Sequence, residues 1–285
     1  MRTSATWFIR RLLPLAAMAW LAAPLPAETL AERTLKEIYA RQTDILAKAD
    51  KAGDEVDVAW LRGELQNVIN SYDVLIQKNP DFAAAYVPYG MLLGKVGMRK
   101  EGTAILLKAN KLDPDIPVVK NQLAKYLAED GHPVDALPWV MAAIDLAPKE
   151  PLYHYQLGEL LSAGRDEFLR EGNFTRATLD KTMLEAFAHA AEFAPDKIEY
   201  AYRLGKAYYE LETPRWDDAL AAWTRLELRP VTAEMRQLVK LQKANVLIKL
   251  GRKQEAADLL EGITDPKMAA EKQTLLDQLT PKPEK

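Results

Sequence analysis

Cysteine is absent from the 285 residues of this sequence. The absence excludes disulfide bonds, thiolate metal ligands, a cysteine nucleophile and an acyl anchor on a lipoprotein cysteine. The apolar fraction of 48% and the charged fraction of 28% are ordinary for a globular protein. The exclusions therefore concern chemistry and leave the fold open.

Motifs that carry chemistry are also few. The three histidines, His132, His154 and His189, are far apart in the sequence and no His-x-x-x-His pair occurs, which argues against a transition-metal site. The sequence has no calcium loop of alternating acids, no phosphate-binding glycine loop and no Gly-x-Ser-x-Gly motif. We therefore expect no catalytic residues, no metal and no cofactor, and we expect that the protein is not an enzyme.

Positive charge is not in excess either. The 38 lysines and arginines are outnumbered by 41 acidic residues, so the formal net charge is −3. Domains that bind nucleic acid usually carry a strongly basic surface. Nucleic acid is therefore not an expected partner.

The first 27 residues have the pattern of a secretory signal peptide. Arg2, Arg10 and Arg11 give a positive start, and an apolar run from Leu12 to Leu25 follows. The run is short for a bilayer span and three prolines lie in or beside it, which favours cleavage, after Ala27, over a permanent helix. The alternative is an uncleaved N-terminal anchor. Cleavage removes three arginines and no acid, changing the net charge from −3 to −6.

The form of this segment is bacterial. We therefore expect a periplasmic or secreted protein whose only membrane contact is through the signal segment before cleavage.

Two consecutive stretches between Pro80 and Pro148 share one pattern. Each has a large residue, an apolar-small pair, another large residue, two small residues, a large residue and a proline, at offsets that recur 34 residues later. The first stretch has Tyr86, Tyr89, Gly90, Leu93, Gly97, Gly102, Leu106 and Pro114; the second has Lys120, Leu123, Ala124, Leu127, Gly131, Ala136, Val140 and Pro148. This pattern resembles the tetratricopeptide repeat (TPR).

The resemblance implies an all-α fold. It would be a right-handed α-solenoid of antiparallel helix pairs (a TPR superhelix) with N-terminal and C-terminal capping helices. Later units end at Pro195, Pro230 and Pro266, after intervals of 47, 35 and 36 residues. The fifth unit is weaker, because Lys243 occupies a position where leucine is expected.

Small residues recur at one offset of each first helix, where a larger side chain would push the partner helix away. They are Gly90, Ala124, Gly158, Gly205 and Ala244. Glycine also recurs where first helices should end, because a left-handed C-cap costs glycine little; these residues are Gly97, Gly131 and Gly251.

The expected organisation has four parts. A signal peptide (1–27) precedes a degenerate helical hairpin that caps the array (28–80), with helices over about 29–50 and 56–78. The repeats follow (81–266), and a capping helix with a frayed tail closes the chain (267–285). Pro88 and Pro138 fall inside predicted helices and either kink them or mark a delayed start; we expect a bend at Pro88. Four tryptophans near apolar helical stripes are expected in the core: Trp60, Trp139, Trp216 and Trp223.

The interval of 47 residues exceeds the repeat by 13, and the excess lies at about 162–182. We expect two lengthened helices that meet at Gly172 and project about 10 Å beyond their neighbours, at about 1.5 Å per residue. Phe168 and Phe174 would then lie near an exposed tip and contact a partner. The alternative is that the two rings pack on each other.

In the family that the sequence resembles, first helices line a concave groove that binds peptides or extended segments of partner proteins. Matching positions here carry amides, tyrosines and a few cations, which suit a polypeptide ligand. The expected partner-binding residues are Asn121, Gln122, Lys125, Tyr155, Gln156, Tyr202, Arg203, Lys206, Tyr209 and Asn245. The alternative is that these residues form ordinary solvated helix faces.

The leading functional hypothesis is a non-catalytic scaffold in the bacterial envelope or periplasm. It would bind a peptide or a partner protein through its concave face. The alternative is an accessory subunit of a cell-wall or polysaccharide enzyme system, with catalysis on another chain.

Overall fold

The computed structural model describes residues 28–280, and the signal-peptide prediction for 1–27 lies outside them. All regular structure in the described range is helical. The helices are α1 (Leu30–Ala52), α2 (Val58–Lys78), α3 (Ala83–Lys95), α4 (Arg99–Leu112), α5 (Pro117–Glu129), α6 (Pro133–Leu146), α7 (Pro151–Ala163), α8 (Arg165–Arg170), α9 (Arg176–Phe193), α10 (Ile198–Ala207), α11 (Trp216–Glu227), α12 (Ala233–Lys249), α13 (Lys253–Glu261) and α14 (Ala269–Leu279). Short 3-10 turns are η1 (Gly53–Glu55), η2 (Tyr208–Glu210) and η3 (Pro266–Met268). Across 28–280, no helix is both long enough and apolar enough to span a bilayer.

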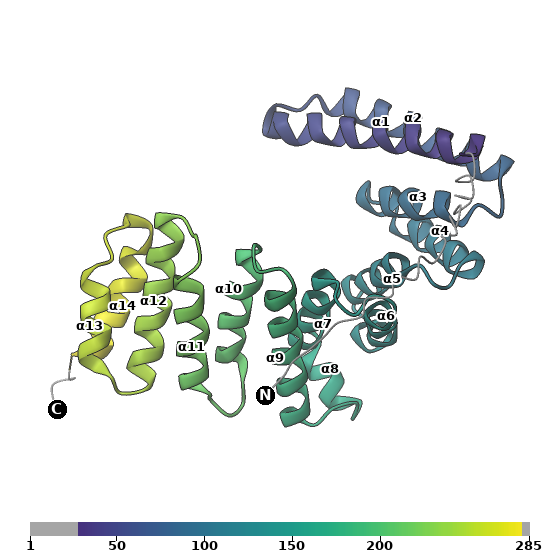
Figure 1. Cartoon of the computed structure of the whole chain (residues 1–285). Coiled ribbons are helices and arrows are strands. Elements are labelled where there is room, and N and C mark those ends of the chain that lie inside the picture. The colour runs from purple at the N-terminus through teal and green to yellow at the C-terminus, as the bar shows by residue number, and fades with distance from the viewer. Residues whose placement is uncertain (1–27, 281–285) are drawn as a thin grey trace, which may run out of the picture.

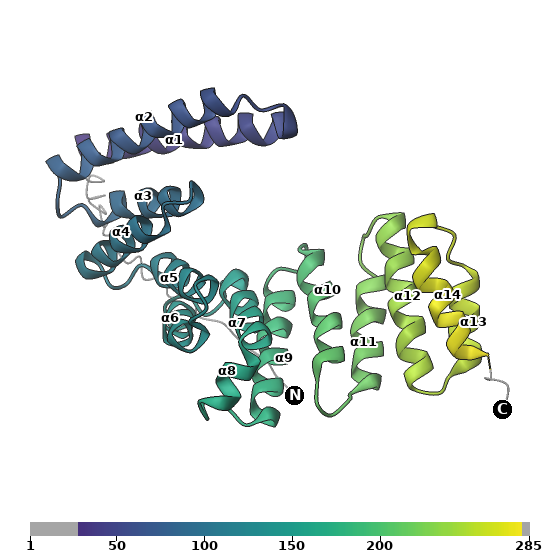
Figure 2. The ribbon, with the colours of Figure 1, turned by 180° about the vertical axis from the view of Figure 1, so that it is seen from behind.

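The helices pack as successive pairs. The pairs are α1 with α2, α3 with α4, α5 with α6, α7 with α9, α10 with α11 and α12 with α13, and α14 packs on the last pair. Each pair contacts its neighbours along the chain (Figures 1 and 2). The chain is therefore an all-α helical-repeat solenoid, which confirms the predicted fold class. In Figure 1 the array bends near α5–α7, and the α1–α2 hairpin extends beyond α3 at one end of the array.

The small residues of the first helices are contact points, as predicted. A Cβ on Gly90 would lie 2.7 Å from Leu106 Cγ, on Gly158 2.6 Å from Phe187 Cε1, and on Gly205 2.6 Å from Trp223 Cζ2. Ala124 and Ala244 occupy the same offset and are buried. In the three glycine-containing pairs, the second helix places one large side chain directly against the backbone of the first helix, and the two helices approach closely because the glycine has no methyl group.

The predicted C-cap glycines have the expected backbone. Gly97, Gly131 and Gly251 have φ values of 88°, 83° and 73°. After Gly97, the Met98 N–H donates to the Leu93 carbonyl at 2.8 Å, and equivalent bonds follow Gly131 and Gly251. This closure satisfies carbonyls that a helix end leaves free.

Both internal prolines lie within continuous helices, so neither marks a delayed start. Pro88 belongs to α3 and Pro138 to α6, each at the sixth residue of its helix. Proline there removes one of the first intrahelical hydrogen bonds, which disturbs a helix least near its N-terminus. The bend at Pro88 stays a prediction.

The N-terminal hairpin is longer than the repeats. α1 has 23 residues and α2 has 21, whereas α3 has 13. At 1.5 Å per residue, α1 is about 35 Å long and α3 about 20 Å. The hairpin joins the array through Tyr72 and Tyr89, whose rings stack with centroids 5.4 Å apart. Its far end overhangs α3 (Figure 1).

The weak fifth unit folds in register despite its lysine. Ala244, Ala256 and Leu260 are buried, and Lys243 Nζ lies 2.6 Å from Glu227 Oε2 on α11. An ion pair with the preceding unit therefore replaces the apolar contact expected of leucine.

The tryptophan prediction holds for three residues of four. Trp223 is fully buried, and Trp139 and Trp216 are half-buried against the core. Trp60 is 38% exposed, so its core assignment is wrong. It lies in the first turn of α2, where its backbone N–H donates to the Asp57 cap.

The insertion differs from its prediction. α7 ends at Ala163 as a first helix of ordinary length, Gly164 turns the chain, and α8 forms a separate short helix; only α9 is lengthened, to 18 residues. A Cβ on Gly164 would lie 2.5 Å from Pro133 Cβ, so the turn is set by packing against the start of α6. The prediction of two lengthened helices is therefore wrong, although the turn at Gly172 is present with φ 72°.

The two phenylalanines of the insertion are not an exposed contact point. Phe168 is fully buried, Phe174 is half-buried, and their rings meet edge to face with centroids 5.7 Å apart. The alternative, in which the rings pack on each other, is correct. The exposed part of the turn is polar.

We predict opposite effects for two glycine-to-alanine substitutions. Gly205→Ala forces a methyl group against Trp223 and should destabilise the protein by about 1–3 kcal/mol. Gly63→Ala, in the exposed part of α2, meets nothing within 4 Å and should stabilise it by about 0.5–1 kcal/mol through helix propensity. Urea denaturation followed by circular dichroism measures both. Equal effects would show that close helix approach is not what the glycine provides.

Candidate partner-binding face

The predicted partner-binding residues lie on first helices of four successive units. They fall on α5, α7, α10 and α12, with Tyr209 in the turn η2 that follows α10. Their exposure differs widely: Lys125 and Lys206 are exposed, Asn121 is buried, and the remaining seven are half-buried. Most of this face is therefore a packed polar layer with a limited number of free groups.

Arg203 is held by its own chain. Its Nε donates to Glu159 Oε1, and its Nη1 donates to Glu210 Oε1 at 2.8 Å. Its Nη2 donates to Ser162 Oγ at 2.9 Å, and the guanidinium lies 4.3 Å from the centroid of the Phe187 ring. The side chain is 17% exposed. The guanidinium already donates to the carboxylates of Glu159 and Glu210, so few of its N–H groups are available to a ligand carboxylate.

Two further arginines extend this arrangement. Arg165 Nη2 lies 3.2 Å from Glu210 Oε2, and Arg176 donates to the backbone carbonyl of Glu210. Arg176 Nε also donates to Asp180 Oδ1 at 2.9 Å, while Asp180 Oδ2 accepts from the Glu212 N–H at 2.8 Å. We call Arg165, Arg176 and Arg203 with Glu159, Asp180 and Glu210 the arginine network. It fastens the insertion to α10 and the turn after it.

The tyrosines of this face pack against neighbouring aromatic rings. Tyr155 lies 4.7 Å from Tyr200 and Tyr202 lies 5.2 Å from Trp223, as ring centroids, and Tyr209 Oη donates to the Gln242 carbonyl at 3.2 Å. Burial raises the pKa of Tyr155, Tyr202 and Tyr209 above the usual value. All three hydroxyls therefore stay protonated at neutral pH, as hydrogen-bond donors.

Two amides of this face have an unused acceptor. Asn121 Oδ1 and Gln156 Oε1 are buried atoms without a hydrogen-bond partner among the residues described. A buried acceptor left unpaired costs about 1–3 kcal/mol. Asn121 is only 3% exposed, so its acceptor is out of a ligand's reach, whereas the half-buried Gln156 gains from a ligand N–H.

The exposed polar groups are spread along the face. Lys125 Nζ lies 3.8 Å from Glu129 Oε1, and Lys206 Nζ lies 5.4 Å from the centroid of the Tyr209 ring. Gln122 and Asn245 are half-buried on α5 and α12. These four side chains remain accessible to a partner.

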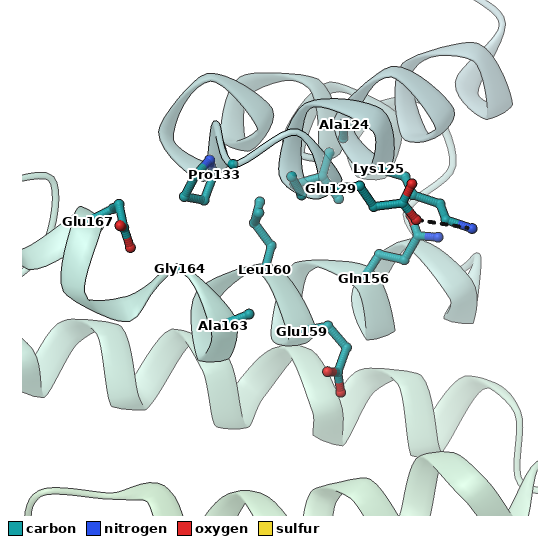
Figure 3. Close-up of a pocket in the computed structure, with 13 residues that line it drawn as sticks. Ala124, Lys125, Glu129, Pro133, Gln156, Glu159, Leu160, Ala163, Gly164 and Glu167 are labelled. Atoms are coloured by element: carbon teal, nitrogen blue, oxygen red, sulfur yellow. Dashed lines mark ion pairs between the residues drawn. The ribbon is translucent and has the colours of Figure 1, made fainter. Parts of the chain in front are cut away.

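An open cleft lies between α5–α6 and α7–α8, with a volume of about 530 Å³ (Figure 3). It brings together two of the ten predicted residues, Lys125 and Gln156. Tyr202, Arg203 and Tyr209 cluster separately around α10. The sequence prediction therefore identifies one border of the cleft but not the cleft itself.

Sequence reasoning missed most members of the arginine network. Glu210 follows Arg203 by seven residues, which is two helical turns and thus the same face, so this pair had a detectable signal. Arg165, Arg176 and Asp180 come from the insertion, whose path was predicted wrongly. Their positions depend on a tertiary packing contact that no spacing encodes.

Two of the three histidines meet in space. His154 on α7 and His189 on α9 belong to the same helix pair, with ring centroids 5.1 Å apart, and both contact Phe193. His154 Nε2 is within 2.8 Å of the Pro148 carbonyl oxygen. Within residues 28–280, no group of three or more potential ligands is placed to hold a metal ion. The pair is an aromatic contact between α7 and α9.

Comparison with known proteins identifies the fold. No family model matches the chain. Tetratricopeptide repeat protein 13 of Homo sapiens is 26% identical over 187 residues, which is 56% of this chain and 22% of that protein. The chain thus spans about a fifth of the length of this curated relative.

Solved structures agree. Pseudomonas aeruginosa PilF has a TM-score of 0.58 at 12% identity, covering 87% of this chain and 99% of PilF. PilW, described as a widely conserved type IV pilus biogenesis factor, has a TM-score of 0.56 at 12% identity, covering 88% and 100%. At 12% sequence identity, the similarity to PilF and PilW shows a shared fold and nothing about function.

We predict that Arg203→Ala lowers the free energy of unfolding by about 2–3 kcal/mol, because Glu159 and Glu210 lose a shared cation. Arg203→Lys should not restore it, since an ammonium cannot bond to both carboxylates and Ser162 in one plane. Lys206→Ala, at an exposed neighbour, should stay within about 0.5 kcal/mol. Urea denaturation measures all three. A neutral Arg203→Ala variant would contradict the network's structural role.

Proposed function

Starting from the tetratricopeptide-repeat fold of this chain, we propose that it is a non-catalytic scaffold that binds a segment of a partner protein through its first-helix face. One observation carries the proposal. The first helix α7 holds Gln156, which lines the open cleft and whose Oε1 lacks a hydrogen bond among the described residues. Backbone N–H groups of an extended polypeptide supply such bonds whatever the sequence of the segment.

The accessible groups suit the same ligand. Gln122, Lys125, Lys206 and Asn245 occur on three first helices and offer donors, acceptors and positive charge. Half-buried tyrosines between them add contact area at low cost in side-chain entropy. Arg203 has no direct part in the proposal, because the arginine network occupies it.

We further propose that the protein acts in the bacterial envelope or periplasm. The basic and apolar pattern of residues 1–27 supports export. The fold likeness to PilW, a pilus biogenesis factor, is consistent with this location. The partner would be a protein or peptide.

Photo-crosslinking in the native cell tests the binding face. A photoreactive residue at Gln122, Lys206 or Asn245 should capture the same dominant partner. Exposed positions on second helices are matched controls that should capture none or unrelated proteins: Lys108 on α4 and Arg225 on α11. Equal capture from both sets would refute the proposed face, and capture only from the turn at 171–174 would move binding to the insertion. Recovery of the crosslinks in the cytoplasmic fraction would refute the proposed location.

A further inference from the structure

The cleft between α5–α6 and α7–α8 owes its shape to the insertion. Gly164 ends α7 against Pro133, and α8 then runs beside α6 instead of extending α7. The end of the cleft next to the insertion is lined by Gly131, Pro133, Gly164 and Glu167. No other unit of the array has an inserted helix at this place. The cleft is therefore a local feature of this chain that borders the first-helix face and shares Lys125 and Gln156 with it.

The middle of the cleft is apolar and lined by small side chains. Ala124 and Ala128 come from α5, Val140 from α6, and Leu160 and Ala163 from α7. In Figure 3, Leu160 points up from α7 into the space between the helices. The volume of about 530 Å³ lies within the range of about 300–1,000 Å³ that is usual for ligand pockets. A leucine or methionine side chain would fit between these walls.

Polar groups stand at the two ends of the cleft. At one end, Gln156 from α7 faces the Lys125–Glu129 pair of α5 (Figure 3). Gln156 Oε1 is buried and lacks a hydrogen bond. At the other end stands Glu167, whose carboxylate is paired only loosely with Arg170, at 3.9 Å. The lining thus offers an unpaired acceptor at one end and an available negative charge at the other.

We propose that this cleft binds an extended segment of a partner polypeptide that inserts a leucine or methionine side chain between α5 and α7. A backbone N–H of the segment donates to Gln156 Oε1, and a lysine or arginine beside the apolar residue pairs with Glu167. The inference rests on the proposed function, because it specifies part of the segment that the scaffold binds.

The charges favour a polypeptide over a lipid. Three glutamates and one lysine line the cleft. One of the glutamates, Glu159, points away from the cleft toward Arg203 (Figure 3). An acyl chain offers no N–H to Gln156, and an anionic head group at the opposite end of the cleft would meet Glu167. Glu129 is already paired with Arg99 and Lys125. A basic, apolar peptide satisfies both ends of the cleft.

Methyl NMR of the full chain tests the proposal directly. Ala124, Ala128, Val140, Leu160 and Ala163 all carry methyl groups that report on the cleft. The probes are capped heptapeptides with a central leucine flanked by lysine, and matched peptides with serine for leucine or glutamate for lysine. We expect the leucine-lysine peptide to shift these methyl signals, and either replacement to weaken binding by about tenfold, which is about 1.4 kcal/mol.

Variants of the chain separate the contributions. Ala163→Leu narrows the cleft from an exposed helical position and should abolish the shifts, whereas Ala221→Leu, an exposed alanine on α11, should not. Glu167→Gln should weaken the lysine peptide about tenfold and leave the glutamate peptide unchanged or slightly tighter. Gln156→Leu should weaken every peptide while leaving the thermal midpoint equal or higher, because the unpaired acceptor is removed. A residue with a merely structural role would lower the midpoint.

Three results would overturn the inference. They are shifts confined to methyl groups outside the cleft, binding that Ala163→Leu leaves unchanged, and cleft shifts caused by vesicles of phosphatidylglycerol but not by peptides. Absence of any peptide-induced shift would also overturn it. The proposed function would survive each of these results if photo-crosslinks from Lys206 and Asn245 still capture one partner, so the two failures are distinguishable.

Discussion

The structure depends on the close approach of the two helices within each pair. Gly90, Gly158 and Gly205 each receive a leucine, phenylalanine or tryptophan from the second helix at a distance that a methyl group would not permit. The apolar surface buried in this way holds a pair together, and stacking on neighbouring pairs supplies what one pair cannot bury alone. The curvature of the array, and hence the shape of any binding face, follows from how these pairs stack.

A second constraint acts where the repeat is interrupted. The insertion lengthens the chain between α7 and α9, and Phe168 and the arginine network fix it in place. An inserted loop without such anchors would be mobile, because fixing the two ends of a loop does not fix the residues between them. In this chain the insertion is ordered, because Gly164 packs against Pro133. A cleft therefore forms between the α5–α6 and α7–α9 units, lined by residues of both.

Much of this fold was predictable from the sequence, because the relevant signals are local or recur. The offset shared by Gly90, Ala124 and Gly158 reports a helix contact in every unit, and a glycine such as Gly97 marks a helix end by backbone conformation alone. The path of the insertion was not predictable. Gly164 and Gly172 are both turn signals, and only the contact with Pro133 decides that the chain turns at the first one.

The candidate site was predictable to a smaller degree. Helical offsets place Lys125 and Gln156 on the correct helices. Offsets cannot show that Glu159, 44 residues before Arg203 in the sequence, forms an ion pair with Arg203 and so makes the guanidinium unavailable to a ligand. The partner-binding role of the ten residues and the fate of residues 1–27 stay predictions.

The overhang of the α1–α2 hairpin has a consequence for local opening. Ile38 and Ile45 of α1 and Leu65 of α2 belong to a cluster that continues into α3, whereas the 3-10 turn η1 packs mainly on α1 and has no buried residue. Local opening is easiest where few neighbours hold a segment, so backbone amides near Gly53 should exchange their hydrogens with solvent well before those near Tyr72. The end of the molecule would then fray from its tip inward while the base of the hairpin remains closed.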